Sequence, residues 1–359
     1  ITLLATGLGD DRVTVSLTAG EDGFFVLDTQ GPYNDYLAIS DDDTVRGAAS
    51  SLPLIVFGGQ GHDDIETGSG DDIVFGDRGR VHYEDEAGNL VTLLGLGGLG
   101  DFHDGVARDP VRVFTVDPMV GGDDIIATND GEDIVFGGVN SDTIGSGAHN
   151  DIVIGDHGIV DYVAADGDNS DIDFIVSTDE TIGGNDTIYG GGGNDFVIAG
   201  EDGDIAENDV WTSPAQVTRR IVADSTEGDT VYAGAGNDLV FGDHGVIEGD
   251  VDANLLPLSM LAKPFAFRSI HTDAALGGND RLFGEDGEDI LIGGQKDDVI
   301  YGGNDDDDLI GGHNIGSGAG EPAHADVLGH RAARHRRAGE DLPARRHPRR
   351  HDCRHRAAR

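Results

Sequence analysis

Short apolar stretches recur along this chain at a spacing of nine residues, each after a glycine-rich polar stretch. The clearest run covers 275–310, where four units follow one another as ALGGNDRLF, GEDGEDILI, GGQKDDVIY and GGNDDDDLI. The eighth place of each unit is aliphatic, with Leu282, Leu291, Ile300 and Leu309. Apolar stretches this short are typical of strands rather than helices. The pattern therefore predicts one bend and one short strand per unit.

The glycines predict how the units assemble. Glycine reaches backbone conformations with positive φ at little cost, so the first half of each unit is expected to bend. Two bends and two strands make one flattened coil of eighteen residues, in which residue i lies beside residue i+18. Stacked coils are stabilised mainly by contacts between neighbours. We predict an all-β fold, a parallel β-roll (β-solenoid) interrupted by irregular β and loop excursions.

The sixth place of the units is aspartate, which predicts metal binding. Stacked coils would align these carboxylates at a spacing of about 4.8 Å, where they repel one another unless a cation lies between them. Oxygen ligands of flexible geometry favour calcium over magnesium or zinc. A solvated acidic face is the alternative, but it does not require acids in phase with glycines. The candidate calcium ligands are Asp63, Asp72, Asp124, Asp133, Asp142, Asp151, Asp186, Asp195, Asp204, Asp229, Asp238, Asp280, Asp289, Asp298 and Asp307.

The candidates differ in how well the sequence pairs them. Asp124 and Asp142 are eighteen residues apart, as expected for neighbours in adjacent coils. Four candidates have no sixth-place aspartate eighteen residues before or after them. Their calcium sites are therefore expected to be incomplete. These four are Asp63, Asp72, Asp229 and Asp238.

The units resemble the RTX (repeats-in-toxin) nonapeptide G-G-x-G-x-D-x-U-x, where U is a large aliphatic residue. The unit GGGGNDFVI, which begins at Gly190, is closest to this consensus. The resemblance implies a parallel β-roll that holds several calcium ions between the loops of adjacent turns. It also implies export by a type I secretion system and an extracellular or cell-surface location.

The repeats fall into blocks separated by excursions. A phrase D-I/L-V-F/I-G-D-R/H-G begins at Asp72, Asp151 and Asp238 and marks a longer super-repeat. We predict a lead-in of irregular β structure at 1–57, block 1 at 58–81, an insertion at 82–118, block 2 at 119–160, an insertion at 161–180, blocks 3 and 4 at 181–247, an insertion at 248–274, block 5 at 275–314, and a basic, disordered tail at 315–359.

Composition narrows the possible partners. The chain has 69 acidic and 23 basic residues, which argues against nucleic acid and anionic membranes as partners and favours cations. No run of eighteen apolar residues occurs, so no membrane insertion by this region is expected. Without metal, so many acids and glycines oppose a compact state, and folding is expected to depend on metal. The start at Ile1, without a methionine or leader, suggests a fragment of a longer protein.

The last residues have the opposite charge. Eleven of the 23 bases lie in 331–359, among Arg, Ala, His and Pro. One interpretation is a basic tail that binds nucleic acid or the acidic roll. The other, which we favour, is a GC-rich gene translated out of frame after a single-base error.

Other motifs give no support for catalysis. The stretch GLGGLG at 95–100 matches a dinucleotide fingerprint but lacks a following helix pattern, so a surface loop is predicted. His157 and His244 lie in two copies of the repeated phrase, but the first copy has Arg78 there, which favours a structural turn over a metal or acid–base role. Protease, esterase and Walker motifs are absent from the sequence, and we expect a non-enzyme.

These observations predict the calcium-binding region of a secreted bacterial RTX-like protein that folds on calcium binding outside the cell. One role is a structural or adhesin-type spacer, with self-association or a surface or matrix partner. The alternative is a calcium-dependent carrier module of a secreted enzyme or toxin whose catalytic domain lies outside this sequence.

Overall fold

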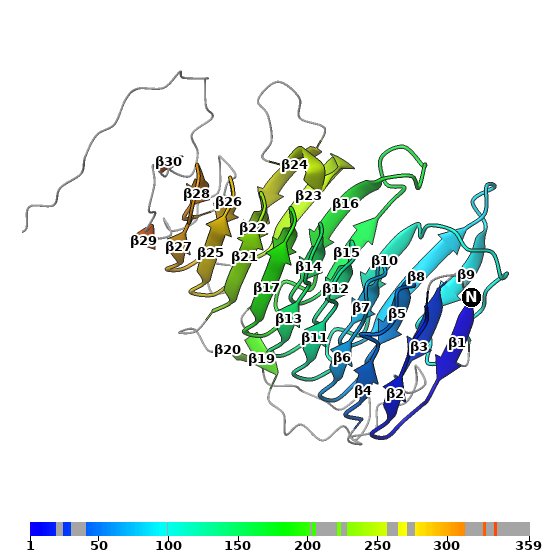
Figure 1. The fold of residues 1–359 in the computed structure, drawn as a ribbon. Coiled ribbons are helices and arrows are strands. Elements are labelled where there is room, and N and C mark those ends of the chain that lie inside the picture. Colours follow the sequence, from blue (N-terminus) through cyan, green and yellow to red (C-terminus); the bar gives the residue numbers. More distant parts are fainter. Residues whose placement is uncertain are drawn as a thin grey trace, which may run out of the picture.

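The computed structural model describes residues 1–18, 24–29, 41–98, 100–201, 203–205, 221–223, 228–256, 265–270, 277–312, 326–327 and 334–335. Within these residues the chain is all-β, apart from one short 3-10 helix, η1 (Ala253–Leu255). The strands lie side by side in an elongated stack (Figure 1). The predicted parallel β-roll is confirmed.

Two parallel sheets form the roll, and successive coils contribute one strand to each. Sheet 1 has eleven described strands in the spatial order β1 (Thr2–Ala5), β3 (Phe25–Asp28), β5 (Leu54–Phe57), β7 (Ile73–Phe75), β12 (Ile134–Phe136), β14 (Ile152–Ile154), β18 (Phe196–Ile198), β22 (Leu239–Phe241), β26 (Ile290–Ile292), β28 (Asp308–Ile310) and β30 (Arg334–His335).

Sheet 2 lies on the other side of the coil. Its ten described strands are, in order, β2 (Arg12–Thr14), β4 (Thr44–Arg46), β6 (Asp64–Glu66), β11 (Ile125–Ala127), β13 (Thr143–Gly145), β17 (Thr187–Gly192), β21 (Thr230–Ala235), β25 (Arg281–Asp286), β27 (Val299–Tyr301) and β29 (Asp326–Val327).

The register follows the nine-residue unit. Ile126 pairs with Ile144 in sheet 2, and Val135 pairs with Val153 in sheet 1, each eighteen residues away as predicted. These eighth-place side chains are at most 2% exposed and belong to one apolar core between the two sheets. Burial of one aliphatic side chain per strand holds the coils together.

The roll begins before the first glycine-rich block. β1, β3 and β5 pair in parallel in sheet 1, and β2 and β4 do so in sheet 2. This differs from the irregular lead-in expected for 1–57. Val26 lies beside Ile55, 29 residues later, so these coils carry longer loops that hide the nine-residue phase.

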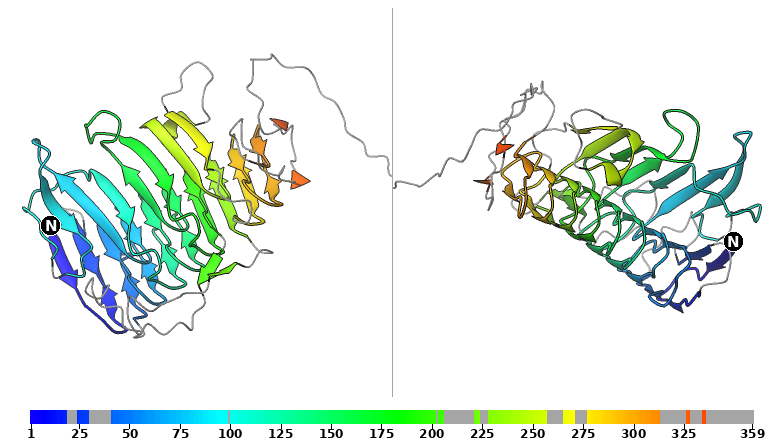
Figure 2. Two further views of the ribbon diagram at one scale, coloured as in Figure 1. Left: turned by 180° about the vertical axis from the view of Figure 1, so that it is seen from behind. Right: turned by 45° about the horizontal axis from the view of Figure 1, so that its top comes forward.

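The excursions form a third sheet rather than irregular loops. Its strands run antiparallel, and strands from different excursions pair with one another, as β10 does with β15 and β16 with β23. The right-hand view of Figure 2 shows this sheet along one side of the coil. In spatial order the strands are β24 (Phe265–Ser269), β23 (Gly245–Val251), β16 (Ile172–Ser177), β15 (Gly158–Asp161), β10 (Arg112–Thr115), β8 (Gly79–Glu84) and β9 (Leu90–Leu94).

A second apolar core joins the third sheet to sheet 1. Phe75 stacks between Phe57 and Phe136 with ring centroids 5.0 Å apart on either side, and this row packs with Val160 and Ile175 of the third sheet. The described molecule therefore has three layers, with sheet 1 in the middle. An irregular excursion could not bury this apolar face as completely, because its backbone groups would lack partners.

Two parts of the chain depart from the repeat pattern. β19 (Gly203–Ile205) and β20 (Ile221–Ala223) form a separate antiparallel pair outside the roll. β29 and β30 add one short strand to each roll sheet, although disorder was expected from 315 onward. The rest of the predicted tail lies outside the described residues.

Candidate metal sites

Two rows of aspartates run along the roll, and each member directly precedes a strand. Ladder 1 precedes strands of sheet 1 and contains Asp72, Asp133, Asp151, Asp195, Asp238, Asp289 and Asp307. Ladder 2 precedes strands of sheet 2 and contains Asp43, Asp63, Asp124, Asp142, Asp186, Asp229, Asp280 and Asp298. All predicted candidates except Asp204 lie in these ladders, and Asp43 is an additional member.

Each ladder is a chain of hydrogen bonds between coils. The backbone N–H of one aspartate donates to Oδ1 of the aspartate in the next coil, as Asp124 does to Asp142 at 2.7 Å and Asp133 to Asp151 at 2.9 Å. The donor–acceptor distances from Asp43 to Asp298 and from Asp72 to Asp307 lie between 2.7 and 3.2 Å. One oxygen of each bonded carboxyl group thus fixes the position of its neighbour.

The ladders continue across the excursions. Asp63 donates to Asp124, 61 residues later, and Asp229 donates to Asp280, 51 residues later, both with normal hydrogen-bond distances. Asp72 and Asp238 find their partners across the same excursions. The stacking of the coils therefore gives these four aspartates the neighbours that are missing at a spacing of eighteen residues, while the completeness of their calcium sites stays a prediction. The excursions leave the roll and return without breaking its register.

The second carboxyl oxygen of the ladder aspartates, Oδ2, is not part of these hydrogen-bond chains. Oδ2 is buried and has no hydrogen-bond partner in most members of both ladders, although each carboxyl group is at most 2% exposed. A buried oxygen without a partner costs free energy, so a native structure normally supplies one. The residues concerned are Asp43, Asp63, Asp124, Asp133, Asp142, Asp151, Asp195, Asp229, Asp238, Asp280, Asp289 and Asp298.

Glycine carbonyls lie next to these oxygens. A Cβ atom placed on Gly137 would meet Oδ2 of Asp142 at 2.4 Å and the carbonyl oxygen of Gly155 at 2.1 Å. The same pairing of a carboxyl oxygen and a carbonyl oxygen occurs at Gly76, with Asp124 and Gly137. Only glycine leaves space for these oxygens to converge. Carboxylate and carbonyl oxygens are the ligands that calcium prefers.

The side chains alone do not make a complete site. Among the described residues, no three His, Cys, Asp or Glu side chains come together as a metal-binding group. A bound cation would therefore use ladder carboxylates together with backbone carbonyls of neighbouring coils. Calcium accepts such mixed oxygen ligands with flexible geometry, whereas zinc favours a compact set of nitrogen and sulfur ligands. The residues present fit calcium.

Burial controls the ionisation of the ladders. Loss of hydration raises the pKa of Asp133 to about 8 and that of Asp151 to about 9. The pKa of Asp142 is also raised, first by burial and then by the nearby carboxyl groups of Asp186 and Asp124. Without a cation, the folded ladders therefore favour protonated carboxyl groups.

Asp204 does not belong to either ladder. Its strand β19 pairs antiparallel with β20, and neither strand belongs to sheet 1 or sheet 2. The sequence unit around Asp204 keeps the acid but is not followed by another coil at the expected spacing. The backbone thus places Asp204 outside both ladders, and its predicted role as a calcium ligand stays a prediction.

The repeated phrase contains aspartates with a separate structural role. Asp77 accepts backbone N–H groups from Gly122 at 3.2 Å and Val139 at 2.6 Å, so one side chain joins two later loops. Asp156 and Asp243 make equivalent pairs of bonds. These three aspartates are not among the residues predicted as ligands from the sequence. Their signal was the invariant Gly-Asp step within the three copies of the phrase.

The two histidines of that phrase act in packing. His157 Nε2 lies 3.0 Å from the carbonyl oxygen of Pro118, and burial lowers the pKa of His157 to about 4. His244 Nδ1 lies 3.1 Å from Ser177 Oγ. Arg78, in the equivalent place, faces Asp117 at 3.5 Å. These contacts agree with the predicted structural turn.

A parallel polar row uses the fifth place of the units. The backbone N–H of Asn194 donates to Asn150 Oδ1 at 2.8 Å, and that of Asn237 donates to Asn194 Oδ1 at 2.8 Å. Glu132 donates in the same way to Asp71 at 3.0 Å. The frequent Asn or Asp before the sixth-place aspartate was the signal for this row. It fixes the loops from which the ladders point inward.

Fold and site together define a class of protein: a parallel β-roll whose coils carry buried carboxylates beside glycine carbonyls, which is a cation-binding solenoid. The comparison with protein families identifies these coils as RTX calcium-binding nonapeptide repeats, in matches at 55–80, 120–153, 183–206, 224–246, 274–295 and 283–312. The chain thus carries calcium-binding RTX repeats in a β-roll. Neither the curated proteins nor the solved structures include a match.

The matched segments cover the glycine-rich coils and the start of β8 and β23, but they leave the N-terminal strands β1 to β4, the strands β29 and β30 and most of the third sheet outside. In the described part of the chain, no helix has the length and apolar character needed to cross a membrane.

Proposed function

We propose that ladders 1 and 2 bind calcium through Oδ2 of their aspartates and the adjacent glycine carbonyls, and that this binding drives the roll to fold. The observation that carries the proposal is the row of buried carboxyl oxygens without hydrogen-bond partners. A cation would compensate both their lost hydration and their mutual repulsion. Calcium would thus contribute folding free energy directly.

The biological role proposed from this chemistry is a conditional spacer. At low calcium inside a cell, repulsion within the ladders would disfavour the roll and leave the chain suitable for export. Millimolar calcium outside lies in the affinity range of extracellular modules and would promote folding there. The extended stack of coils supports a structural or adhesin-type spacer (Figure 1). Its secretion by a type I system and its extracellular location are parts of this proposal.

The second candidate is a carrier module for an enzyme or toxin domain encoded elsewhere in a longer protein. The third sheet favours this carrier role, because the sheet is added to the roll and the ladders do not require it. Further copies of the super-repeat in the flanking gene sequence would favour the spacer. A catalytic motif there would favour the carrier. We propose no catalytic role for the described region.

Circular dichroism during a calcium titration of the full chain tests the calcium proposal. We expect a cooperative rise of β signal with calcium and a much smaller one with magnesium. Asp151→Asn should weaken the calcium response about tenfold or more in midpoint concentration, because it removes a buried anionic ligand. Asp168→Asn, in an exposed loop of the third sheet, is the matched control. A chain equally folded in chelator and in calcium would disprove calcium-driven folding.

A further inference from the structure

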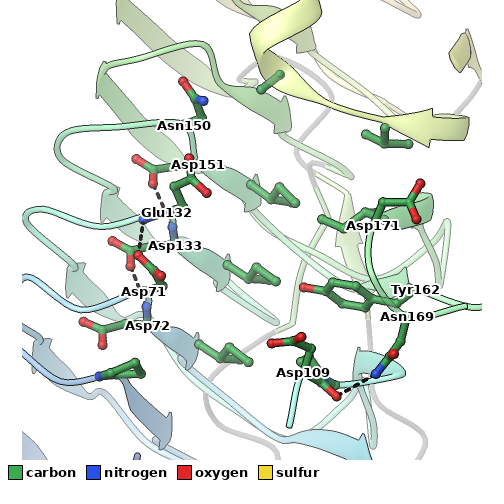
Figure 3. A pocket seen from close by; sticks show the side chains of 18 of the residues that line it. Asp71, Asp72, Asp109, Glu132, Asp133, Asn150, Asp151, Tyr162, Asn169 and Asp171 are labelled. Carbon is green, nitrogen blue, oxygen red and sulfur yellow. Dashed lines mark hydrogen bonds between the residues drawn. The ribbon is translucent and has the colours of Figure 1, made fainter. Parts of the chain in front are cut away.

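A cavity of about 670 Å³ lies where sheet 1 and the third sheet diverge. Figure 3 shows its two sides, with Asp71, Glu132 and Asn150 on the roll and Asp109 and Asp171 on the excursions. Its volume is in the range of small-molecule sites. Neither the ladders nor the proposed calcium function explains why this space is open.

The floor of the cavity is apolar and regular. Ile55, Ile73, Ile134 and Ile152 line it, and each pairs in register with the next in sheet 1. One isoleucine therefore occurs per coil, at the strand spacing of about 4.8 Å. Such a floor suits an extended ligand with an aliphatic body that runs along the roll axis.

The two rims of the cavity carry acidic and amide groups. Asp71 and Glu132, in successive coils, are exposed on the roll side, and Asp109 is exposed on the opposite side. The 3-10 helix η1 bounds the cavity beyond Asn150, whose Nδ2 donates to Asn254 Oδ1 at 3.1 Å. The site is thus a bounded trough and does not extend along the whole molecule.

The charge of the lining is unbalanced. Its residues include eight carboxyl groups and a single guanidinium, that of Arg108. Three of the eight belong to ladder 1 and are neutralised there by calcium or protonation, which leaves the five carboxylates of Asp71, Asp109, Glu132, Asp171 and Asp252. Arg108 is held by both oxygens of Asp104, at 2.8 and 2.7 Å, so its charge is already matched outside the cavity lining. An anionic or neutral ligand would leave the rim carboxylates without a counter-charge. The electrostatics favour a cationic ligand.

Two tyrosines provide aromatic walls close to the acidic rim. Tyr83 and Tyr162 line the cavity, and Tyr83 stacks on Phe24 with ring centroids 5.8 Å apart. Burial and the nearby Asp109 carboxylate raise the pKa of both phenols, which keeps them neutral at physiological pH. Neutral aromatic rings beside a carboxylate suit an ammonium group, which gains from the ring face as well as from the negative charge.

We propose that this trough binds a linear aliphatic polyamine, with its methylene chain on the isoleucine floor and its ammonium groups at the two acidic rims. A three-carbon link separates amine groups by about one strand spacing, so successive ammonium groups can follow successive coils. A calcium ion does not suit the trough, because among the described residues no three acidic side chains converge there and the floor offers no oxygen ligands.

Calorimetric titration of the full chain with spermidine tests the proposal. The experiment is done in saturating calcium, so that the ladders are occupied, and in 150 mM salt, because a chain with a net charge of −46 attracts any polycation weakly. We expect saturable binding of one spermidine per chain, with at least tenfold weaker binding of an uncharged diol of the same length. A calcium indicator in the same solution should report no calcium release.

Substitutions at the rim opposite ladder 1 distinguish this site from the calcium sites. The double variant Asp109→Asn/Asp171→Asn should weaken spermidine binding about tenfold. The double variant Glu180→Gln/Glu248→Gln removes the same charge from exposed positions that do not line the cavity, and it should bind normally. Circular dichroism in calcium verifies that both variants are folded.

The outcomes that would overturn the proposal are specific. They are equal loss of affinity in both double variants, equal binding of the diol, displacement of calcium by spermidine in proportion to binding, or no saturable binding by the folded native chain. The comparison of spermidine with the diol uses only the native chain. It therefore tests the proposal even if a variant fails to fold. The calcium proposal is judged separately by the titration that precedes it.

Discussion

At the scale of single residues, the roll depends on glycines and aspartates that fit one another. Gly137 has no side chain because two oxygens occupy the space where a Cβ would lie. Asp142 contributes one of them, and its other oxygen binds the preceding coil. The aspartate therefore combines a structural bond with a free ligand atom. Substitution of either residue should affect both stability and calcium binding.

The glycine requirement can be tested directly. Gly137→Ala should lower the free energy of unfolding in calcium by about 1–3 kcal/mol, because the new methyl group would overlap Gly155 O and Asp142 Oδ2. Gly145→Ala is the matched control, since nothing lies within 4 Å of a Cβ at that strand position. Urea unfolding followed by circular dichroism measures both. Equal effects of the two substitutions would contradict the packing argument.

At the scale of elements, burial shifts the titration of the ladder aspartates in one direction. Burial raises the pKa of Asp72 to about 6, that of Asp238 to about 7 and that of Asp289 to about 8. The unfolded chain has ordinary carboxyl pKa values near 4, so the metal-free fold binds more protons than the unfolded chain between these limits. Protonation and calcium are therefore alternative ways to neutralise a ladder.

The pH dependence follows from that difference. In chelator, the stability of the fold should decrease as pH rises from about 4 to 9, because the unfolded chain releases its protons first. Calcium affinity should increase over the same range, because the metal binds ionised carboxylates. Urea unfolding in chelator and calcium titrations at several pH values measure the two trends. A metal-free fold that becomes more stable at higher pH would rule out buried, protonated ladders.

The third sheet is an element whose contribution is apolar. Ile175 is fully buried against sheet 1, whereas Ile125 is 58% exposed on the outer face of sheet 2. Ile175→Ala should cost about 2–4 kcal/mol of unfolding free energy, and Ile125→Ala should change it by less than about 0.5 kcal/mol. Thermal or urea unfolding in calcium tests the pair. Similar small effects would mean that the third sheet does not stabilise the roll.

At the scale of the whole molecule, the coils form one stack although the excursions separate them in sequence. Stability in such a stack comes from neighbouring coils, so coupling between residues should depend on the number of coils between them. Asp63 and Asp124 are neighbours in space and 61 residues apart in the chain. Asp63 and Asp298 lie far apart in ladder 2.

Double-mutant cycles can test whether the coupling between ladder aspartates depends on the number of coils between them. In chelator at neutral pH, Asp63→Asn and Asp124→Asn should each stabilise the fold, because each removes a carboxyl group whose pKa is raised by burial, and for Asp63 also by the neighbouring Asp124 carboxyl group. Their combined effect should fall short of the sum by about 0.5 kcal/mol or more. Asp63→Asn and Asp298→Asn should be additive within about 0.5 kcal/mol. Additivity of the first pair would contradict the continuous ladder across the excursion.

The sequence predicts the aspartates of the glycine-rich coils better than those of the other parts of the chain. Ladder members such as Asp142 and Asp289 were identified because the phase of nine residues reports directly on position in the coil. Asp43 was missed because its coil lacks the glycine pair, and only its place two residues before Val45 marks it. Asp204 keeps the phase, but its strand leaves the stack.

The sequence by itself determined the all-β class, the coil of eighteen residues and most of the ladder aspartates, because these depend on local bends and on a short, strict repeat. Only the tertiary structure decided that the ladders cross the excursions and that the excursions pair into one sheet, since those contacts join residues 45 to 79 positions apart. No local pattern specifies such pairs. They form because the growing stack brings the sheet edges together and buries the apolar face of sheet 1.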